Sequence, residues 1–129
     1  MACKPILIVE DDADIREALQ AFFEAEGYPV LLAKHGQAAL DLFGMNSTIT
    51  PGLIFLDLTM PVMDGAAFLA ELQRNYPIVF QKTPIFIMSA RADTHSLTHM
   101  TTGFLKKPFD LDQLCRIAAC FMTDQTHLS

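Results

Sequence analysis

Basic residues are scarce in this sequence, which contains nine lysines and arginines against fifteen aspartates and glutamates, a net charge of −6. Its longest basic run is the pair Lys106-Lys107. A DNA-binding surface needs clustered lysines and arginines that displace counterions from the phosphates. We therefore expect no direct binding of nucleic acid. Any link to transcription would run through another protein or through a domain absent from this sequence.

Long apolar runs are absent as well. No stretch approaches the roughly 18 residues that a helix needs to span a bilayer, and the first residues lack the apolar core and cleavage site of a secretory signal. The three cysteines, Cys3, Cys115 and Cys120, are an odd set without the spacing of metal ligands. We expect no membrane partner, reduced thiols and a cytoplasmic location.

The overall composition is that of a compact globular domain. Hydrophobic residues make up 51% of the 129 residues and charged residues 19%, a balance that favours a packed core over disorder. At this length we predict a single domain over residues 1–129. Its core should cover about 4–122, and residues 123–129 should form a polar, linker-like tail.

Short aliphatic runs alternate with helical patterns along the chain, and runs such as Ile6–Val9 are typical of strands covered on both faces. Asp14 and Glu17 resemble a capping box that starts a helix, and Gly27 ends it. The remaining predicted strands are 30–33, 53–56, 84–88 and 103–106, and the remaining helices are 38–43, 64–75 and a last one capped by Asp110. This alternation favours an α/β fold, a doubly wound five-stranded parallel sheet with helices on both faces.

Two segments carry weaker patterns. Residues 93–102 are rich in β-branched and hydroxyl-bearing side chains, which are mediocre helix formers, so we expect a short or irregular fourth helix there. Residues 76–83 contain the apolar stretch Tyr-Pro-Ile-Val-Phe. We expect a long connection in this segment, which either covers the edge of the core or offers a surface to a partner.

Acidic residues stand directly after two of the predicted strands: Glu10-Asp11-Asp12 after the first and Asp57 after the third. Neighbouring parallel strands are about 4.8 Å apart, so carboxylates at their carboxyl ends can share one ion. Oxygen ligands without His or Cys suit Mg²⁺ (or Mn²⁺). Residues 10–12 could instead serve as helix caps, but Asp57 follows an apolar run, and a buried charge is costly unless it is paired.

Four short motifs together resemble the receiver domain of two-component response regulators. They occur in the order that the family has, and they span nearly the whole chain. The motifs are Ile-Leu-Ile-Val-Glu10-Asp11-Asp12, Leu-Asp57-Leu-Thr-Met60-Pro61-Val-Met-Asp64-Gly65, Ile-Met-Ser89-Ala90 and Lys107-Pro108-Phe109. The resemblance implies a flavodoxin-like strand order 2-1-3-4-5.

The resemblance also implies a function and a metal site. Asp57 would accept a phosphoryl group from a phosphohistidine on a sensor histidine kinase or histidine phosphotransfer protein, in a Mg²⁺-dependent reaction. Asp11 and Asp57 would bind the ion directly, Glu10 through water and Thr59 through its backbone carbonyl. Asp12 would lie close to the ion, with a less direct role.

The remaining implied roles concern the response to phosphorylation. Lys107 would pair with Asp57 at rest and with the phosphoryl oxygens afterwards, and Pro108 would follow a cis peptide. Ser89 would donate its hydroxyl to the phosphoryl group, and Phe104 would turn into the space that Ser89 vacates. Arg91, with Thr59, would tune the phosphate lifetime. Catalysis would be limited to self-directed phosphotransfer and autodephosphorylation, and the output protein or fused output domain is unknown.

Other interpretations of the sequence differ in what they do with phosphate. A haloacid-dehalogenase-type phosphatase also uses an Asp nucleophile but needs a second acid where this chain has Thr59. Flavodoxin-like cofactor binding needs a phosphate loop rich in glycine and hydroxyl groups after the first strand. A receiver-like interaction module that is never phosphorylated is the third alternative. The interval from Ser89 to Lys107 is shorter than in a usual receiver, which affects the expected output face more than the acceptor site.

Overall fold

The computed structural model describes residues 4–45, 50–58, 62–90 and 101–127. Five parallel strands form one sheet in the order β2-β1-β3-β4-β5, which confirms the predicted fold class and strand order. The strands are β1 (Ile6–Val9), β2 (Val30–Ala33), β3 (Leu53–Asp57), β4 (Ile85–Ser89) and β5 (Gly103–Lys106). The helices are α1 (Ala13–Ala25), α2 (Gly36–Met45), α3 (Gly65–Asn75), α4 (Pro77–Lys82) and α5 (Leu111–His127).

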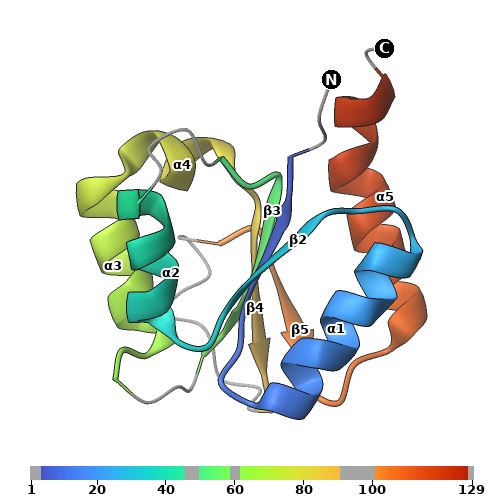
Figure 1. Ribbon diagram of the computed structural model, residues 1–129, viewed down its shortest axis with the longest axis horizontal. Coiled ribbons are helices and arrows are strands. Elements are labelled where there is room, and N and C mark those ends of the chain that lie inside the picture. The colour runs from blue at the N-terminus through green and yellow to red at the C-terminus, as the bar shows by residue number, and fades with distance from the viewer. Residues whose placement is uncertain (1–3, 46–49, 59–61, 91–100, 128–129) are drawn as a thin grey trace.

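Helices cover both faces of the sheet, with α1 and α5 on one side and α2, α3 and α4 on the other (Figure 1). Alternate side chains of each central strand point to opposite faces, so every position of β1, β3 and β4 is buried. Ile8 and Phe55 pack toward α1 and α5, whereas Val9 and Leu56 pack toward α2 and α3. This two-sided burial explains why the strands are continuous apolar runs.

The segment predicted as a long connection contains a short helix, α4. Pro77 stands at its first position, where a proline is compatible with helix because its missing N–H would have no partner there. Val79 is buried, and Phe80 packs against the cluster formed with α2 and α3. The segment therefore covers the edge of the core, which was one of the two predicted alternatives. The prediction of a connection without a helix was wrong.

Three helices differ from the prediction by two residues or more at one end or both. Asp12, and not Asp14, caps α1, because the Asp12 carboxylate accepts bonds from two backbone N–H groups of the first turn. Helix α2 extends beyond both ends of the predicted 38–43 segment. Helix α5 continues to His127 and so includes most of the segment expected to be a linker-like tail. The expected fourth helix at 93–102 lies largely outside the described residues.

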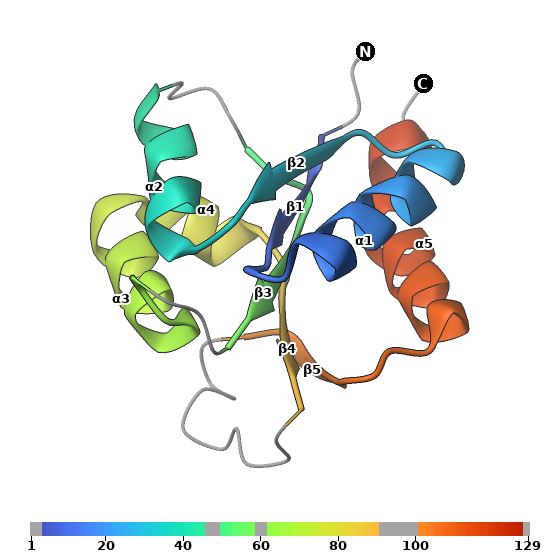
Figure 2. The same ribbon diagram turned by 60° about the horizontal axis from the view of Figure 1, so that its bottom comes forward.

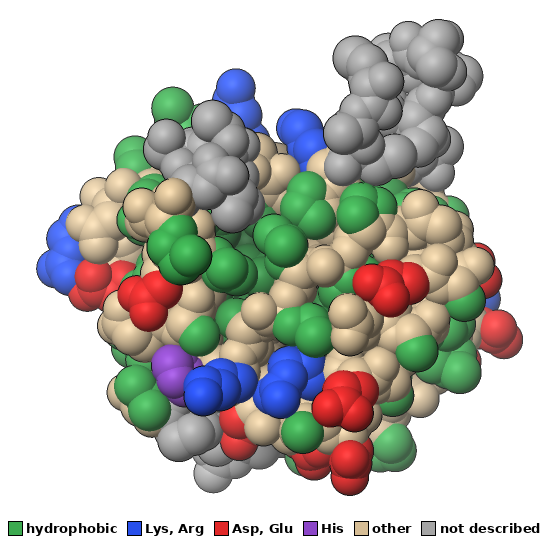
Figure 3. Space-filling model, in the orientation of Figure 1, with side chains coloured by type: hydrophobic (Ala, Val, Ile, Leu, Met, Phe, Trp, Pro, Cys, Tyr) green, Lys and Arg blue, Asp and Glu red, His purple; other side chains and the backbone are tan. Residues whose placement is uncertain are grey.

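The fold gathers the carboxyl ends of all five strands along one edge of the molecule, at the bottom of Figure 1 and turned forward in Figure 2. Acidic and basic side chains gather along this lower edge in the space-filling view (Figure 3). None of the described helices combines the length and the apolar character needed to cross a bilayer.

Candidate functional site

The strand registers bring four of the predicted site residues together. Glu10 follows the last residue of β1 and Asp57 ends β3, and these two strands are neighbours. Asp57 lies opposite Met88 in β4, so Ser89 comes one position further along the next strand. The backbone N–H of Lys107 donates to the carbonyl of Ser89 at 2.8 Å, which extends the pairing of β4 and β5 by one residue.

These residues line a cavity of about 280 Å³ at the strand ends. Its lining consists of Glu10, Asp11, Asp12, Ile15, Asp57, Ser89, Ala90 and Lys107. All the acids that the sequence singled out for metal binding, together with Ser89 and Lys107, therefore face one small space. Thr59 and Arg91 lie outside the described residues.

Three carboxylates form the acidic part of the cavity. One oxygen each from Glu10, Asp11 and Asp57 lies within 4.8 Å of the others. Glu10 and Asp57 are buried, whereas Asp11 is exposed at the mouth of the cavity. Three oxygen donors at this spacing, with one of them open to solvent, fit a hard divalent cation that keeps part of its water shell.

Lys107 provides the positive charge of the cavity. Its Nζ lies 2.8 Å from Oε1 of Glu10 and 3.4 Å from Oδ1 of Asp57. The expected pairing with Asp57 is thus present as an ion pair, but Glu10 is the nearer partner. The contact with Glu10 was not predicted. The peptide bond between Lys107 and Pro108 is cis, as the resemblance implied.

The electrostatics of the cavity oppose ionisation of Asp57. Burial, reinforced by the neighbouring carboxylates of Asp11 and Glu10, raises the pKa of Asp57 to about 7, although Lys107 acts in the opposite direction. Burial also acts to raise the pKa of Asp11, but its contacts with Asp57 and Glu10 and the charge of Lys107 leave that pKa lowered. The two neighbouring aspartates therefore have pKa values shifted in opposite directions, and the more buried one, Asp57, is the one whose pKa is raised.

Burial and the neighbouring carboxylates have opposing effects on the pKa of Lys107. Burial alone would lower the pKa of the Lys107 ammonium, but the carboxylates of Glu10 and Asp57 outweigh this effect and raise that pKa. The lysine is therefore fully charged at neutral pH.

The side chains of Arg16 and Asp12 fix the backbone that carries the acids. Nη1 of Arg16, on α1, donates to the carbonyl oxygen of Glu10 at 2.9 Å and to that of Asp11 at 3.4 Å. The carboxylate of Asp12 accepts bonds from the N–H groups of Asp14 at 2.9 Å and Ile15 at 3.2 Å. Asp12 thus acts as the helix cap that the sequence analysis held open for residues 10–12. Arg16 was missed, and its only sequence signal is its position in the first turns of α1.

The first residue of α3, Gly65, lies close to the end of β3. A Cβ on Gly65 would lie 3.0 Å from the carbonyl oxygen of Asp57 and 3.0 Å from Cα of Leu58. The N–H of Gly65 also donates to the carbonyl of Leu58 at 2.9 Å. Glycine here lets the start of α3 pack directly behind the strand end that presents Asp57.

Phe104 lies on β5, opposite Ile87 of β4. It is half-buried and packs against the cluster on the α2–α3 side of the sheet. This position is compatible with a side chain that turns, and the switching role stays a prediction.

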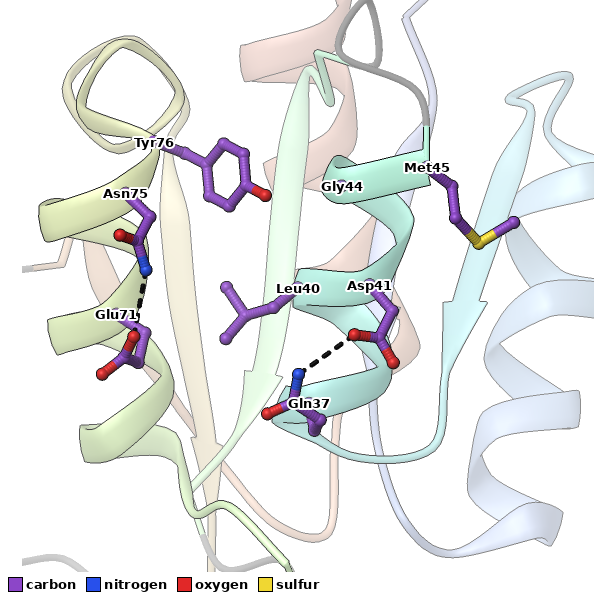
Figure 4. Close-up of a pocket in the computed structure, with 8 residues that line it drawn as sticks. All are labelled: Gln37, Leu40, Asp41, Gly44, Met45, Glu71, Asn75 and Tyr76. Carbon is purple, nitrogen blue, oxygen red and sulfur yellow. Dashed lines mark hydrogen bonds between the residues drawn. The ribbon is translucent and has the colours of Figure 1, made fainter.

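Two other hollows lie on the surface, and one of them adjoins the acidic cavity. The larger, of about 540 Å³, is between α2 and α3 (Figure 4). Its polar side chains largely satisfy one another, since Gln37 donates to Asp41 at 3.0 Å and Asn75 donates to Glu71 at 3.0 Å. The other, of about 430 Å³, is mostly apolar and shares Ile15, Ala90 and Lys107 with the acidic cavity. The acidic cavity is the smallest of the three, and it places several carboxylates beside the half-buried side chain of Lys107.

Comparisons with known proteins show which family the chain resembles in sequence and in fold. A family model described as the response regulator receiver domain matches residues 6–119. The chain is 32% identical to the regulatory protein AtoC of Escherichia coli over 117 residues, 88% of this chain and 24% of AtoC. It is 36% identical to the response regulator Rre1 of Synechocystis over 114 residues, 84% of this chain and 47% of Rre1. The chain thus spans less than half the length of these relatives.

Solved structures show the same similarity in three dimensions. The chemotaxis protein CheY4 of Vibrio cholerae has a TM-score of 0.80 and 25% identity, over 93% of this chain and 99% of CheY4. A CheY-like response regulator receiver domain protein from Methanospirillum hungatei has a TM-score of 0.79 and 25% identity, over 96% of this chain and 98% of that one. The chain therefore belongs to the response regulator receiver domain family.

Proposed function

We propose that this domain is a phosphoacceptor of a two-component system, which takes a phosphoryl group onto Asp57 and changes conformation in response. The observation that carries the proposal is the convergence of Asp57, two further carboxylates, Ser89 and Lys107 in one cavity of about 280 Å³. Such a cavity offers a nucleophile, ligands for a cation, and donors for phosphoryl oxygens. Phosphoryl transfer depends mainly on this kind of positioning and charge stabilisation.

The carboxylates of Asp11 and Asp57 would bind Mg²⁺ or Mn²⁺ directly and that of Glu10 through water, with the backbone carbonyl of Thr59 as a further ligand and Asp12 nearby. When bound, the cation neutralises negative charge on the acceptor and on the incoming phosphoryl oxygens. It would also favour the ionised form of Asp57, whose pKa is about 7 in the protein alone. The ionised form is the nucleophile.

In the transfer step, a carboxylate oxygen of Asp57 attacks the phosphorus of a phosphohistidine. A P–O bond forms, the P–N bond breaks, and its electron pair leaves with the donor imidazole, giving an acyl phosphate on Asp57. Lys107, now 3.4 Å from Asp57 Oδ1, is close enough to pair with the phosphoryl oxygens. Ser89 would donate its hydroxyl to another of these oxygens.

The donor must be a protein that carries its histidine into this cavity, either a sensor histidine kinase or a histidine phosphotransfer protein. The apolar hollow beside the cavity supports this, because Ile15, Ala90 and Lys107 line both. Leu111, on the rim of the hollow, is a large exposed hydrophobic side chain. An apolar surface next to a charged site suits a partner that docks by apolar contact and delivers a charged group.

We further propose that output runs through a separate protein or through another part of a longer protein, in the cytoplasm. Movement of Ser89 toward the phosphoryl group, followed by Phe104, would transmit the change to the β4–β5 side of the sheet. The net charge of −6 argues against direct contact of this domain with nucleic acid.

Acetyl phosphate, a small phosphodonor, tests the acceptor directly. The protein is incubated with acetyl phosphate and Mg²⁺, and intact mass is measured before and after. We expect one added phosphoryl group, its loss in Asp57→Asn, and its loss when a chelator removes Mg²⁺. Glu17→Gln is the matched control, since it makes the same carboxylate-to-amide change at an exposed position of α1.

The same measurement can contradict the proposal in two ways. A wild-type protein that gains no phosphoryl group would not be a phosphoacceptor under these conditions, which favours the unphosphorylated interaction module. An Asp57→Asn variant that is still labelled to the wild-type extent would place the acceptor elsewhere.

A further inference from the structure

We propose that Glu10 is a positioning residue that holds the ammonium of Lys107 in the unphosphorylated protein and limits its pairing with Asp57. The role rests on the proposed function, in which Lys107 must reach the phosphoryl oxygens on Asp57. The family resemblance assigned Glu10 only to the metal ion, through water. The contacts in the structure assign it a second task.

Both carboxylate oxygens of Glu10 are engaged within the chain. Oε1 accepts from Lys107 Nζ at 2.8 Å, and Oε2 accepts from the backbone N–H of Asp12 at 3.2 Å. The Glu10 side chain is 0% exposed. A carboxylate that is buried and bonded at both oxygens has a fixed orientation, so it defines where the ammonium rests.

The position of Lys107 favours Glu10 over Asp57. A separation of 2.8 Å between nitrogen and oxygen is that of a strong charge-assisted hydrogen bond. The 3.4 Å separation from Asp57 Oδ1 is longer than the usual length of such bonds, so this ion pair is the weaker of the two contacts. The lysine therefore neutralises Glu10 first and Asp57 only in part.

This arrangement has a consequence for the acceptor. Because Lys107 is held by Glu10, it does not block Asp57 with a short ion pair before the cation and the donor arrive. Addition of a phosphoryl group brings further negative charge to Asp57 and attracts the ammonium. Transfer of Lys107 would leave Glu10 buried without its partner, which is costly, so Glu10 opposes the movement until that charge is present.

The hydrogen bond can be located in solution by NMR. A protein labelled with ¹⁵N and ¹³C, free of metal and unphosphorylated, is examined for scalar couplings between Lys107 Nζ and carboxylate carbons. We expect a coupling to Cδ of Glu10 and none to Cγ of Asp57. In Glu10→Gln, we expect the signature to shift to Asp57, whereas Glu17→Gln should leave the wild-type pattern unchanged.

A second readout uses Mg²⁺ alone. Glu10→Gln should weaken Mg²⁺ binding, measured by calorimetry, by about tenfold or more, because one charge is lost and Lys107 moves onto Asp57. Adding Lys107→Met in the same background should recover most of that loss. This double variant leaves no unmatched charge at the two positions, so it is the safer one to fold.

Three results would overturn the proposal. One is a wild-type coupling of Lys107 to Asp57 in place of Glu10. Another is a Glu10→Gln spectrum in which Lys107 has not moved, and the third is a double variant that binds Mg²⁺ no better than Glu10→Gln. The NMR experiment requires neither phosphate nor metal. Failure of acetyl phosphate labelling would therefore remove the proposed function, while a Lys107–Asp57 coupling in the wild type would remove only this inference.

Discussion

Replacing Asp57 with asparagine should stabilise the metal-free protein. The Asp57 side chain is only 6% exposed, and burial together with Asp11 and Glu10 raises its pKa to about 7. Ionising this group in the folded protein therefore costs free energy that ionising it in the unfolded chain does not. Asparagine has nearly the same shape and never carries the charge.

The sign of the pH dependence follows from the raised pKa. An acid whose pKa is higher in the folded protein contributes stability below its unfolded pKa, and this contribution is lost as the pH rises through the folded value. The interval from 3.8 to about 7 corresponds to about 4 kcal/mol at 1.36 kcal/mol per pH unit. Solvent at the mouth of the cavity screens these charges, so we expect about half of this, about 2 kcal/mol.

The assay is urea unfolding of wild type and Asp57→Asn, at pH 5 and pH 8, in the presence of a chelator. We expect Asp57→Asn to be more stable by about 2 kcal/mol at pH 8 and by less than about 1 kcal/mol at pH 5, where Asp57 in the folded wild type is already protonated. Glu17→Gln, which changes an exposed carboxylate on α1, should show no such difference between the two pH values.

Mg²⁺ should reverse this order. A ligand that binds only the folded protein stabilises it by an amount that grows with the logarithm of its concentration relative to Kd, and Asp57 is one of the residues proposed to bind Mg²⁺. Saturating Mg²⁺ should therefore stabilise wild type at pH 8 and have little effect on Asp57→Asn. If the stability gain of Asp57→Asn is absent, or equal at both pH values, then the folded protein does not disfavour ionisation of Asp57, and the electrostatic account of the cavity is wrong.

Two further predictions concern the backbone around the site. Asp12→Ala should be less stable than Asp12→Asn by about 1 kcal/mol in urea unfolding, because both remove the charge but only alanine removes the cap on α1; equal stabilities would contradict the capping role. Val62 has a φ of 69° and is 78% exposed, so Val62→Gly should gain about 1 kcal/mol by relieving strain without loss of packing. Val62→Ala is the control, since alanine keeps most of the strain and should gain much less.

Most of the sheet could be predicted because burial on both faces leaves a direct mark on the sequence. The strands β1, β2 and β5 have the predicted bounds, β3 extends one residue further to Asp57, and β4 begins and ends one residue later than predicted. Helix α4 was missed because Ile78, Val79 and Phe80 are adjacent and show no helical period. A helix of six residues is too short to show a clear periodicity, and a proline at its start is also common in connections.

In the site, too, some features could be predicted from the sequence and others could not. That Glu10 and Asp57 meet follows from topology, because neighbouring parallel strands end at the same edge. That Lys107 lies nearer to Glu10 than to Asp57 depends on a difference of less than 1 Å between two carboxylates on adjacent strands. Side-chain rotamers decide such a difference, and no spacing in the sequence records them.

Arg16, a residue of α1 that does not line the acidic cavity, supports the backbone of the site. Its guanidinium donates to the carbonyl oxygens of Glu10 and Asp11, so it orients the backbone that carries these two acids. A cation that paired with these carboxylates would compete with Mg²⁺, as Lys107 does in part. The charged side chains around this cavity thus have different roles. Arg16 fixes the backbone and Glu10 binds the ammonium of Lys107. The carboxylate oxygens of Asp11 and Asp57 are the ones proposed to bind a cation directly.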